Sequence, residues 1–223
     1  MESKIRAIIT GSTGMVGEGV LHECLLSEDI EVVLVINRKP CGIVHPKLKE
    51  ILHQDFFSFS AIEAQLQGYN AAYFCLGISS IGVKNDEYYK FTYTLTMHVA
   101  STLSRLNSDM TFCYISGAGT DSTEKGPSHW ARVKGKTEND LMKLPFHKVF
   151  VFRPGFLKPI DGLQQTHSFY KFINWVFPIG RSLYPNGFCK LEELGRAMIH
   201  AVKNGYDKNI IEGKDIIKLA QNQ

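Results

Sequence analysis

Long apolar runs and targeting signals are both missing from this sequence of 223 residues. It contains no window of about 18 consecutive apolar residues, so we expect no membrane-spanning helix. The N-terminal residues, MESKIRAIIT, lack the apolar core of a signal peptide ahead of the first β-branched run, so we expect no export. Together the two absences predict a cytoplasmic protein.

Charge of one sign and paired cysteines are also scarce. The sequence holds 25 Lys and Arg residues against 22 Asp and Glu residues, a net charge of +3. Nucleic-acid-binding domains usually carry a strongly basic stripe, so we expect no nucleic-acid partner. The cysteines are odd in number and isolated, without the spacing of zinc ligands. We expect no metal and reduced thiols at Cys24, Cys41, Cys75, Cys113 and Cys189.

Glycine is concentrated in one stretch near the N-terminus, AIITGSTGMVGEGV. A β-branched strand runs directly into Gly11, Gly14 and Gly17, and an apolar helical pattern follows. In such a unit the first glycine permits a tight turn, the second lets the backbone approach a pyrophosphate at the helix N-terminus, and the third lets the helix pack on the strand. A glycine-rich turn that binds nothing is the alternative. We predict a dinucleotide site that includes Gly11, Ser12, Thr13, Gly14, Met15, Val16 and Gly17.

Short β-branched runs alternate with helical patterns over the first two thirds of the chain. This alternation is typical of a parallel sheet with helices on both faces. Strands are predicted near residues 5–10, 31–37, 51–53, 71–76, 111–115 and 148–153, with clear helices after Asp86 and from Pro127 toward Leu144. The predicted fold is a Rossmann-type α/β doubly wound parallel sheet, forming a single domain over residues 1–223.

The pattern changes after Pro154. Apolar residues recur at helical spacing over residues 167–179 and 191–202, and Gly205 follows as a cap. We predict that residues 156–205 form a small helical cover over the carboxyl edge of the sheet, where such sheets bind ligands. Core packing is the ordinary explanation of the aromatic stripe in 167–179. A substrate lid or a subunit contact is the functional alternative.

The second predicted strand ends in VLVINRKP, a segment that bears on the cofactor. An acidic residue at this position binds the adenosine ribose of NAD, whereas a nearby arginine suits the 2′-phosphate of NADP. Asn37 occupies the acidic position and Arg38 and Lys39 follow, which favours NADP(H) over NAD(H). A solvated turn is the alternative for the two cations. Asp55 either contacts the adenine or caps the turn that begins at Phe56.

Several motifs at strand ends share a family pattern. The segments CLGISS, ISGAG, VKGKTE and VFRPGF, with TGSTGMVG, resemble the short-chain dehydrogenase/reductase superfamily in its extended or atypical, epimerase- and dehydratase-like branch. The motifs are closest to the Tat-interacting-protein-like oxidoreductase group. The resemblance covers residues 4–156 and the KLEELGRAMI helix. It implies that the cofactor is bordered by Leu76, Gly77, Arg153, Pro154 and Gly155.

In that superfamily a serine after the fifth strand and a YxxxK pair carry out the chemistry. The resemblance assigns the serine to Ser116 and the lysine to Lys134, which also holds the cofactor ribose, while Trp130 occupies the tyrosine position. An indole N–H donates a hydrogen bond but does not titrate near neutral pH. The usual proton relay is therefore broken, and another proton donor is needed. Candidates are Tyr88, Tyr89, Tyr93, His129 and a bound water.

Three functions follow from these observations. The first is an NADP(H)-dependent oxidoreductase or epimerase-like enzyme acting on a small, largely apolar substrate. The second is a non-catalytic NADPH-sensing regulatory protein, which Trp130 favours because a sensor has no use for the tyrosine. The third is a scaffold that has lost the cofactor. A homodimer is expected only on the general frequency of symmetric dimers.

Overall fold

The computed structural model describes residues 4–163, 177–178, 180–184 and 187–221. Its centre is a sheet of seven parallel strands in the order β3-β2-β1-β4-β5-β6-β9. The strands are β1 (Ile5–Thr10), β2 (Ile30–Asn37), β3 (Leu48–Leu52), β4 (Ala71–Phe74), β5 (Thr111–Ile115), β6 (Lys148–Arg153) and β9 (Ile210–Glu212). The strand order reverses direction at β1, as in doubly wound sheets. The predicted Rossmann-type fold is confirmed.

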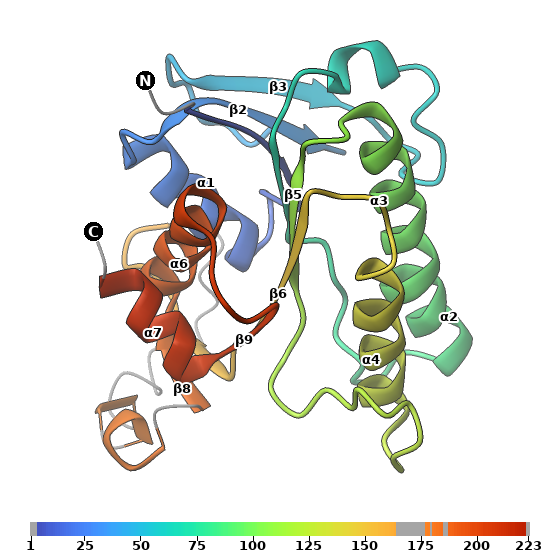
Figure 1. The fold of residues 1–223 in the computed structure, drawn as a ribbon, viewed down its shortest axis with the longest axis vertical. Helices are drawn as coiled ribbons and strands as arrows, with labels where there is room; N and C mark the ends of the chain where they lie inside the picture. Colours follow the sequence, from blue (N-terminus) through green and yellow to red (C-terminus); the bar gives the residue numbers. More distant parts are fainter. Residues whose placement is uncertain (1–3, 164–176, 179, 185–186, 222–223) are drawn as a thin grey trace.

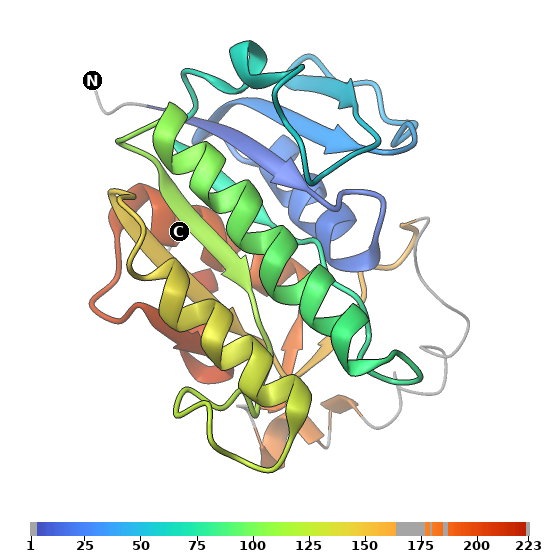
Figure 2. The ribbon, with the colours of Figure 1, turned by 90° about the vertical axis from the view of Figure 1, so that its right-hand side faces the viewer.

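Helices cover both faces of the sheet (Figure 1). One layer holds α1 (Met15–Leu26), α6 (Leu191–Asn204) and α7 (Gly213–Gln221). The other holds α2 (Asn85–Tyr89), the π-helical turn η2 (Lys90–Thr94), α3 (Leu95–Leu106) and α4 (His129–Leu141). In Figure 2, α2, η2 and α3 run on as one long helix beside α4. A short 3-10 helix, η1 (Glu63–Leu66), precedes β4.

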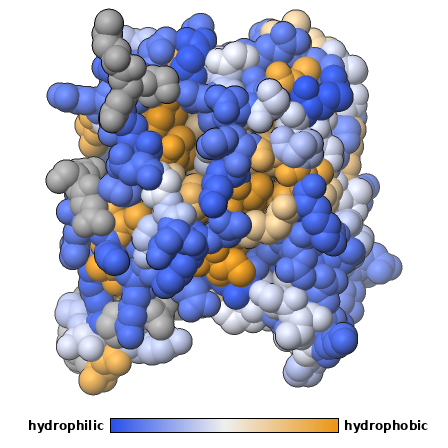
Figure 3. All heavy atoms as spheres, viewed as in Figure 1, coloured by the Kyte–Doolittle hydropathy of each residue, from blue (hydrophilic) through white to orange (hydrophobic). Residues whose placement is uncertain are grey.

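Each face of the sheet packs against its own apolar cluster. Along β1, Ala7 and Ile9 belong to the cluster under α1 and α6, while Ile8 belongs to the cluster under α3. Because the central strands are buried on both faces, they need consecutive apolar residues rather than alternation. Hydrophilic residues cover much of the surface seen in Figure 3, and apolar residues show mainly between the two helical layers.

The helices α1 and α6 cross at two glycines. A Cβ added to Gly19 of α1 would lie 2.3 Å from Leu191 Cγ at the start of α6, and one added to Gly195 of α6 would lie 2.7 Å from Glu23 Cγ. Neither position has room for a side chain. The glycines therefore allow the two helices to approach each other closely.

The C-terminal third differs most from expectation. The segment 191–204 forms α6, which lies beside α1 rather than over the carboxyl edge, because its apolar stripe completes the core on that face. Most of the aromatic stripe in 167–179 lies outside the described residues, so a cover there stays a prediction. Sequence patterns also missed β9 and the small parallel sheet of β7 (Phe156–Lys158) and β8 (Phe188–Lys190). These strands have only three residues each, too few for a periodic signal.

The helix predicted from Pro127 starts two residues later. Ser128 has extended backbone angles and precedes α4, which begins at His129. Asp121 Oδ2 accepts a hydrogen bond from the Gly126 N–H at 2.6 Å, and this bond keeps the preceding loop turned until Ser128. Pro127 therefore lies outside the helix instead of in its first turn.

Candidate functional site

The three glycines of the N-terminal motif each meet a different steric requirement. Gly11 has φ +79°, and a Cβ there would lie 2.8 Å from the backbone of Cys75 in the adjacent loop. A Cβ on Gly17 would lie 2.1 Å from the Gly11 carbonyl oxygen, so only glycine lets α1 pack on the turn. A Cβ on Gly14, which precedes α1, would have only the Gly11 oxygen near it, at 3.5 Å. Space is thus left beside the backbone at the N-terminus of α1.

A cavity of about 270 Å³ lies next to this turn. It opens among the carboxyl ends of β1, β2, β3 and β4, the edge where open α/β sheets bind ligands. Most of its walls are apolar and aromatic, and the polar groups come from the glycine turn, the end of β2 and the loops after β2 and β3. The lining residues are Gly11, Thr13, Ile36, Asn37, Arg38, Gln54, Asp55, Phe56, Phe57, Leu76, Gly77, Ile78, Phe91 and Leu95.

Arg38 supplies the positive charge in this lining. The residue is exposed, and within the described ranges its guanidinium has no ion-pair partner. Its carbonyl accepts a hydrogen bond from Gln54 Nε2 at 2.7 Å, which links the loops that follow β2 and β3. Lys39 follows and is also exposed, but it does not line the cavity. The cavity therefore presents an unpaired cation beside an apolar surface, which suits a ligand with an anionic group.

Asn37 is buried at the end of β2, with 2% of its surface exposed. Its Oδ1 accepts a hydrogen bond from Ser12 Oγ at 2.9 Å, and its Nδ2 donates to Glu50 Oε1 at 2.8 Å. Asn37 thus joins the glycine turn to β3. Sequence patterns did not identify Glu50, because a charged residue in an edge strand is ordinarily a solvated one.

Asp55 caps the turn, as one of its two alternatives predicted, and its contact with the adenine stays a prediction. It lines the cavity, and its Oδ1 accepts a hydrogen bond from the Phe57 N–H at 2.9 Å. This bond turns the chain so that Phe56 and Phe57 form part of the cavity wall. Phe57 lies 6.2 Å from Phe91, measured between ring centroids. Phe91 belongs to η2, and π-helical turns of this kind occur frequently at functional sites.

The predicted catalytic residues lie along β5 and α4, and none of them lines this cavity. Ser116 is buried after β5, where its Oγ donates to the Glu138 carboxylate and lies 3.0 Å from Thr120 Oγ1. Arg153, at the end of β6, pairs with Glu138 and donates to Ser122 Oγ at 2.5 Å. The buried ion pair between Arg153 of β6 and Glu138 of α4 therefore positions the Ser116 side chain through its hydrogen bond to Glu138.

This network sets what the Ser116 hydroxyl can do. A serine hydroxyl has one proton to donate and two lone pairs that accept. That proton is donated in a hydrogen bond to the Glu138 carboxylate, because hydrogen bonds to ionised acceptors are stronger than those to neutral ones. In this arrangement Ser116 presents only acceptor capacity to a ligand. Glu138 was missed at the sequence level, since nothing in the spacing of GKTEND indicates a buried acid.

Lys134 and Trp130 lie on the same helix, one turn apart. Lys134 is partly buried; its Nζ donates to the Ile115 carbonyl at 3.4 Å and lies 5.4 Å from the Tyr114 ring centroid. Burial lowers the pKa of Lys134 to about 8, and the nearby Glu138 carboxylate opposes that effect. Lys134 is thus a base that titrates close to neutral pH. Trp130 is partly buried and does not titrate.

The four side chains predicted as replacement proton donors differ in how they are held. Tyr93 Oη donates to Asp140 Oδ2 at 2.8 Å, and Tyr89 packs on the Tyr93 ring, with centroids 4.9 Å apart. Tyr88 is buried with its ring against His129, and burial raises the pKa of Tyr88. A raised pKa makes a phenol a poorer acid. Tyr88 and Tyr93 are therefore the weaker candidates, and Tyr89, His129 and a bound water stay predictions.

The remaining predicted cofactor residues fall into two groups. Leu76 and Gly77 follow β4 and line the cavity. Arg153 directs its side chain into the buried ion pair, while the Pro154 carbonyl accepts a hydrogen bond from the Ala118 N–H at 2.9 Å. A Cβ on Gly155 would lie 2.4 Å from the Gly187 oxygen. The segment 153–155 thus ties β6 to the loop after β5 and to β8.

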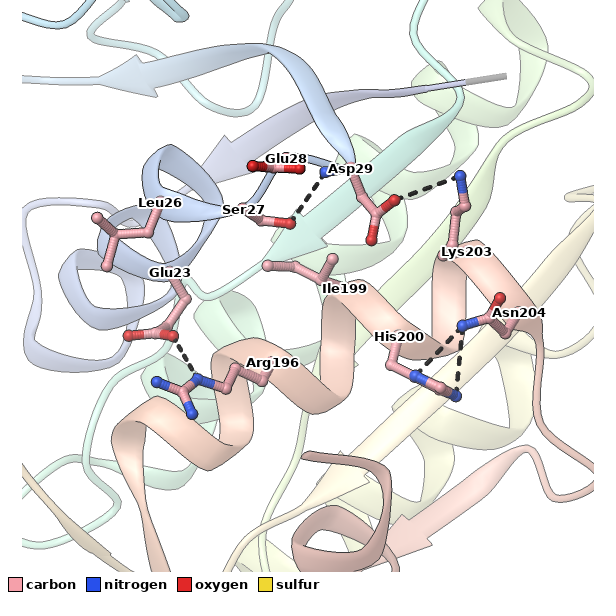
Figure 4. Close-up of a pocket in the computed structure, with 10 residues that line it drawn as sticks. All are labelled: Glu23, Leu26, Ser27, Glu28, Asp29, Arg196, Ile199, His200, Lys203 and Asn204. Atoms are coloured by element: carbon pink, nitrogen blue, oxygen red, sulfur yellow. Dashed lines mark hydrogen bonds and ion pairs between the residues drawn. The ribbon is translucent and has the colours of Figure 1, made fainter. Parts of the chain in front are cut away.

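A larger hollow, of about 620 Å³, lies at the opposite edge of the sheet (Figure 4). It is formed by the C-terminal end of α1, the loop before β2 and the last turns of α6. Glu23 pairs with Arg196 at 2.9 Å and Asp29 with Lys203 at 3.3 Å across it. Four of its charged groups are thus paired with one another, and the hollow is remote from the glycine turn. Within the described ranges, no cluster of His, Cys, Asp and Glu could hold a metal ion, and no helix is long and apolar enough to cross a membrane.

Topology and glycine turn together define a Rossmann-type α/β fold. The chain superposes on the Bordetella bronchiseptica enzyme WbmF in complex with NAD+ with a TM-score of 0.66 and 16% identity, covering 98% of this chain and 77% of that one. Helicobacter pylori ADP-L-glycero-D-manno-heptose-6-epimerase gives a TM-score of 0.66 and 13% identity, covering 99% and 83%. At this identity the likeness establishes the fold.

Two relatives by sequence carry the same name. No family model matches the chain. The protein named "Protein FMP52, mitochondrial" from Candida glabrata is 24% identical over 216 residues, covering 93% of this chain and 89% of the relative. Its namesake from Meyerozyma guilliermondii is 23% identical over 171 residues, covering 75% and 70%.

These names correct one prediction and leave another open. The expected cytoplasmic location is wrong, because both relatives are named as mitochondrial. The expectation rested on a missing signal peptide, which argues against secretion but does not distinguish the compartments inside a cell. Neither relative is named as a Tat-interacting-protein-like oxidoreductase, so that subgroup stays a prediction.

Proposed function

We propose that this protein binds NADP(H) at the carboxyl edge of its sheet and acts as an oxidoreductase on a small, largely apolar substrate. One observation carries the proposal: the unpaired Arg38 lies in an apolar cavity directly beside the glycine turn. The apolar walls suit the adenine, and the guanidinium suits a 2′-phosphate through charge-assisted hydrogen bonds. The structural neighbour WbmF forms a complex with NAD+, which supports a nicotinamide dinucleotide in general.

The glycine turn fits the pyrophosphate of such a ligand. The space beside Gly14 and the free N–H groups at the start of α1 provide an anion site. Ser12 and Thr13 lie in the turn and Met15 and Val16 at the start of α1, while Leu76 and Gly77 line the same cavity as Arg38. Lys134 would hold the nicotinamide ribose, with Pro154 and Gly155 shaping that end of the site.

Replacing Arg38 by alanine tests the cofactor assignment. A charge-assisted hydrogen bond contributes about 1.5–3 kcal/mol, so Arg38→Ala is expected to weaken NADPH binding by roughly 10–100-fold. NADH lacks the 2′-phosphate, and its affinity should change less than about threefold. Fluorescence titration of both nucleotides gives the two affinities. Arg105→Ala, an exposed arginine on α3 remote from the cavity, is the matched control. Unchanged NADPH affinity in Arg38→Ala would contradict the proposal.

The proposed chemistry requires a proton source other than tyrosine. When bound, the nicotinamide would supply the hydride. Lys134, with its pKa lowered to about 8, holds a proton that it exchanges near neutral pH. The Trp130 indole N–H donates a hydrogen bond to a substrate oxygen but retains its proton. Ile78 and Ile81 expose apolar side chains in the loop after β4, which is consistent with an apolar substrate.

An NADPH-sensing protein without turnover is the second candidate. Two features favour it. The Ser116 hydroxyl donates its hydrogen bond to Glu138 rather than to a substrate, and Trp130 occupies the position of the tyrosine. On this alternative, a Trp130→Tyr variant shows carbonyl reduction that the wild type lacks, measured as NADPH oxidation over a panel of carbonyl compounds. Trp130→Phe, which cannot donate a hydrogen bond, is the control. Activity in the wild type with no gain in Trp130→Tyr removes the case for the sensor.

Three broader features belong to the same proposal. The names of the relatives suggest a mitochondrial location. We treat residues 1–223 as one nucleotide-binding domain, with the part of 156–205 before β8 covering the substrate side. A homodimer is compatible with the fold.

A further inference from the structure

Asn37 stands where a dinucleotide-binding sheet usually meets the adenosine ribose, and its amide orientation is fixed by its neighbours. A carboxylate accepts hydrogen bonds and, when ionised, cannot donate them. The group of Asn37 that faces Glu50 at 2.8 Å must therefore be the NH2, and the amide oxygen must face Ser12 at 2.9 Å. Both ends of the side chain are engaged. Asn37 therefore keeps one lone pair on its amide oxygen but no charge with which to hold ribose hydroxyls.

Glu50 brings a carboxylate to this position from the neighbouring strand. In the parallel pairing of β2 with β3, Glu50 is opposite Val35, whose side chain packs in the cluster under α1. Residues two apart on a strand share a face, so Asn37 and Glu50 lie on the same side of the sheet. Glu50 Oε1 also accepts a hydrogen bond from the Cys41 N–H at 2.9 Å. That bond anchors the carboxylate to the loop after Arg38.

An aspartate at position 37 would place two carboxylates in direct contact. Asp at this strand end is the residue type that binds the ribose of NAD. Beside Glu50, which is itself exposed, its charge would lie next to a like charge, and two carboxylates sharing a site resist ionising together. The Glu50 carboxylate on β3 therefore favours a neutral hydrogen-bond donor at position 37. Because residue 37 is neutral, Arg38 is the charged lining residue that directly follows β2.

We propose that Glu50 is a specificity-determining, positioning residue that acts through Asn37. Its charge disfavours an ionised carboxylate at position 37, so that an NAD-type aspartate is not accommodated there while Glu50 is present, and selectivity for a dinucleotide with a 2′-phosphate is preserved. This inference rests on the proposed function of the site. It makes cofactor preference a property of a pair of residues on two strands, rather than of residue 37 alone.

Three variants test this inference: Asn37→Asp, Glu50→Gln and the double variant Asn37→Asp/Glu50→Gln. NADPH and NADH affinities are measured by titration, and thermal stability is measured without nucleotide. Asn37→Asp alone should lower Tm and weaken NADPH binding at least tenfold, with no gain in NADH binding. The double variant should recover Tm and bind NADH at least tenfold more tightly than Asn37→Asp does. Glu50→Gln alone should keep the preference for NADPH. Glu31→Gln, an exposed change near the start of β2, is the control.

The outcomes separate the inference from the function beneath it. NADH binding by Asn37→Asp equal to that of the double variant would overturn the role of Glu50. If Asn37→Asp does not fold, folding of the double variant supports the coupling, and failure of both overturns it. If the wild type binds neither nucleotide, the proposed function fails, while rescue of Tm in the double variant still reports on the pair.

Discussion

Replacing Arg153 by methionine is expected to lower the free energy of unfolding by about 3–5 kcal/mol, because it leaves a buried carboxylate without its partner. The Arg153 side chain is 10% exposed and that of Glu138 is 1% exposed. Glu138 would keep only neutral hydrogen-bond donors such as Ser116. Guanidinium chloride denaturation at neutral pH measures the loss.

Two further variants make this result interpretable. Lys143→Met removes an ion pair with Asp140 in which the lysine is 73% exposed, and it should cost less than about 1 kcal/mol. In the double variant Arg153→Met/Glu138→Leu, the uncompensated charge is gone, so much of the stability should return. A loss below about 1 kcal/mol in Arg153→Met, or no recovery in the double variant, would show that the ion pair is not structurally important.

Replacing Gly17 by alanine is expected to weaken NADPH binding at least tenfold and to destabilise the fold. The added Cβ would lie 2.1 Å from the Gly11 oxygen, so α1 would have to move away from the turn. Overpacking of this kind costs about 1–3 kcal/mol, and the shift would also displace the N–H groups that face the pyrophosphate. Nucleotide titration and thermal unfolding measure the two effects.

Gly117→Ala is the matched control for that variant. An added Cβ at Gly117 meets no atom within 4 Å, and Gly117 is not among the glycines with positive φ. Glycine to alanine at such a position raises stability by about 0.4–1 kcal/mol by restricting the unfolded chain. Wild-type NADPH affinity in Gly17→Ala would refute the assignment of the turn as a pyrophosphate site.

The sequence was informative where one local rule determines the structure. The run from Ile5 through Gly17 predicted strand, turn and helix correctly, since backbone sterics and periodicity act over a few residues there. Strands β5 and β6 were predicted with their observed limits for the same reason. The short strands β7, β8 and β9 depend on partners far away in the chain, and three residues carry no period of their own.

Site residues whose role depends on tertiary contacts could not be predicted from local sequence patterns. Glu138 is buried by Arg153, and Glu50 is recruited by Asn37 from the adjacent strand. In both cases an acidic residue looks ordinary until its partner is known, because charged residues are usually solvated. Cellular location failed for a different reason: composition records little about the compartment in which a protein works.

Because α1 and α6 cross so closely, a truncation before α6 or a substitution within it should affect α1. Gly19 and Gly195 are separated by most of the sequence, yet each packs directly against a side chain of the other's helix, Leu191 and Glu23 respectively. The helix that presents the glycine turn therefore packs against a segment far from it in sequence. A chain cut before α6 would expose the inner face of α1. A bulky residue at Gly195 would displace α1, and with it the glycine turn at the start of that helix.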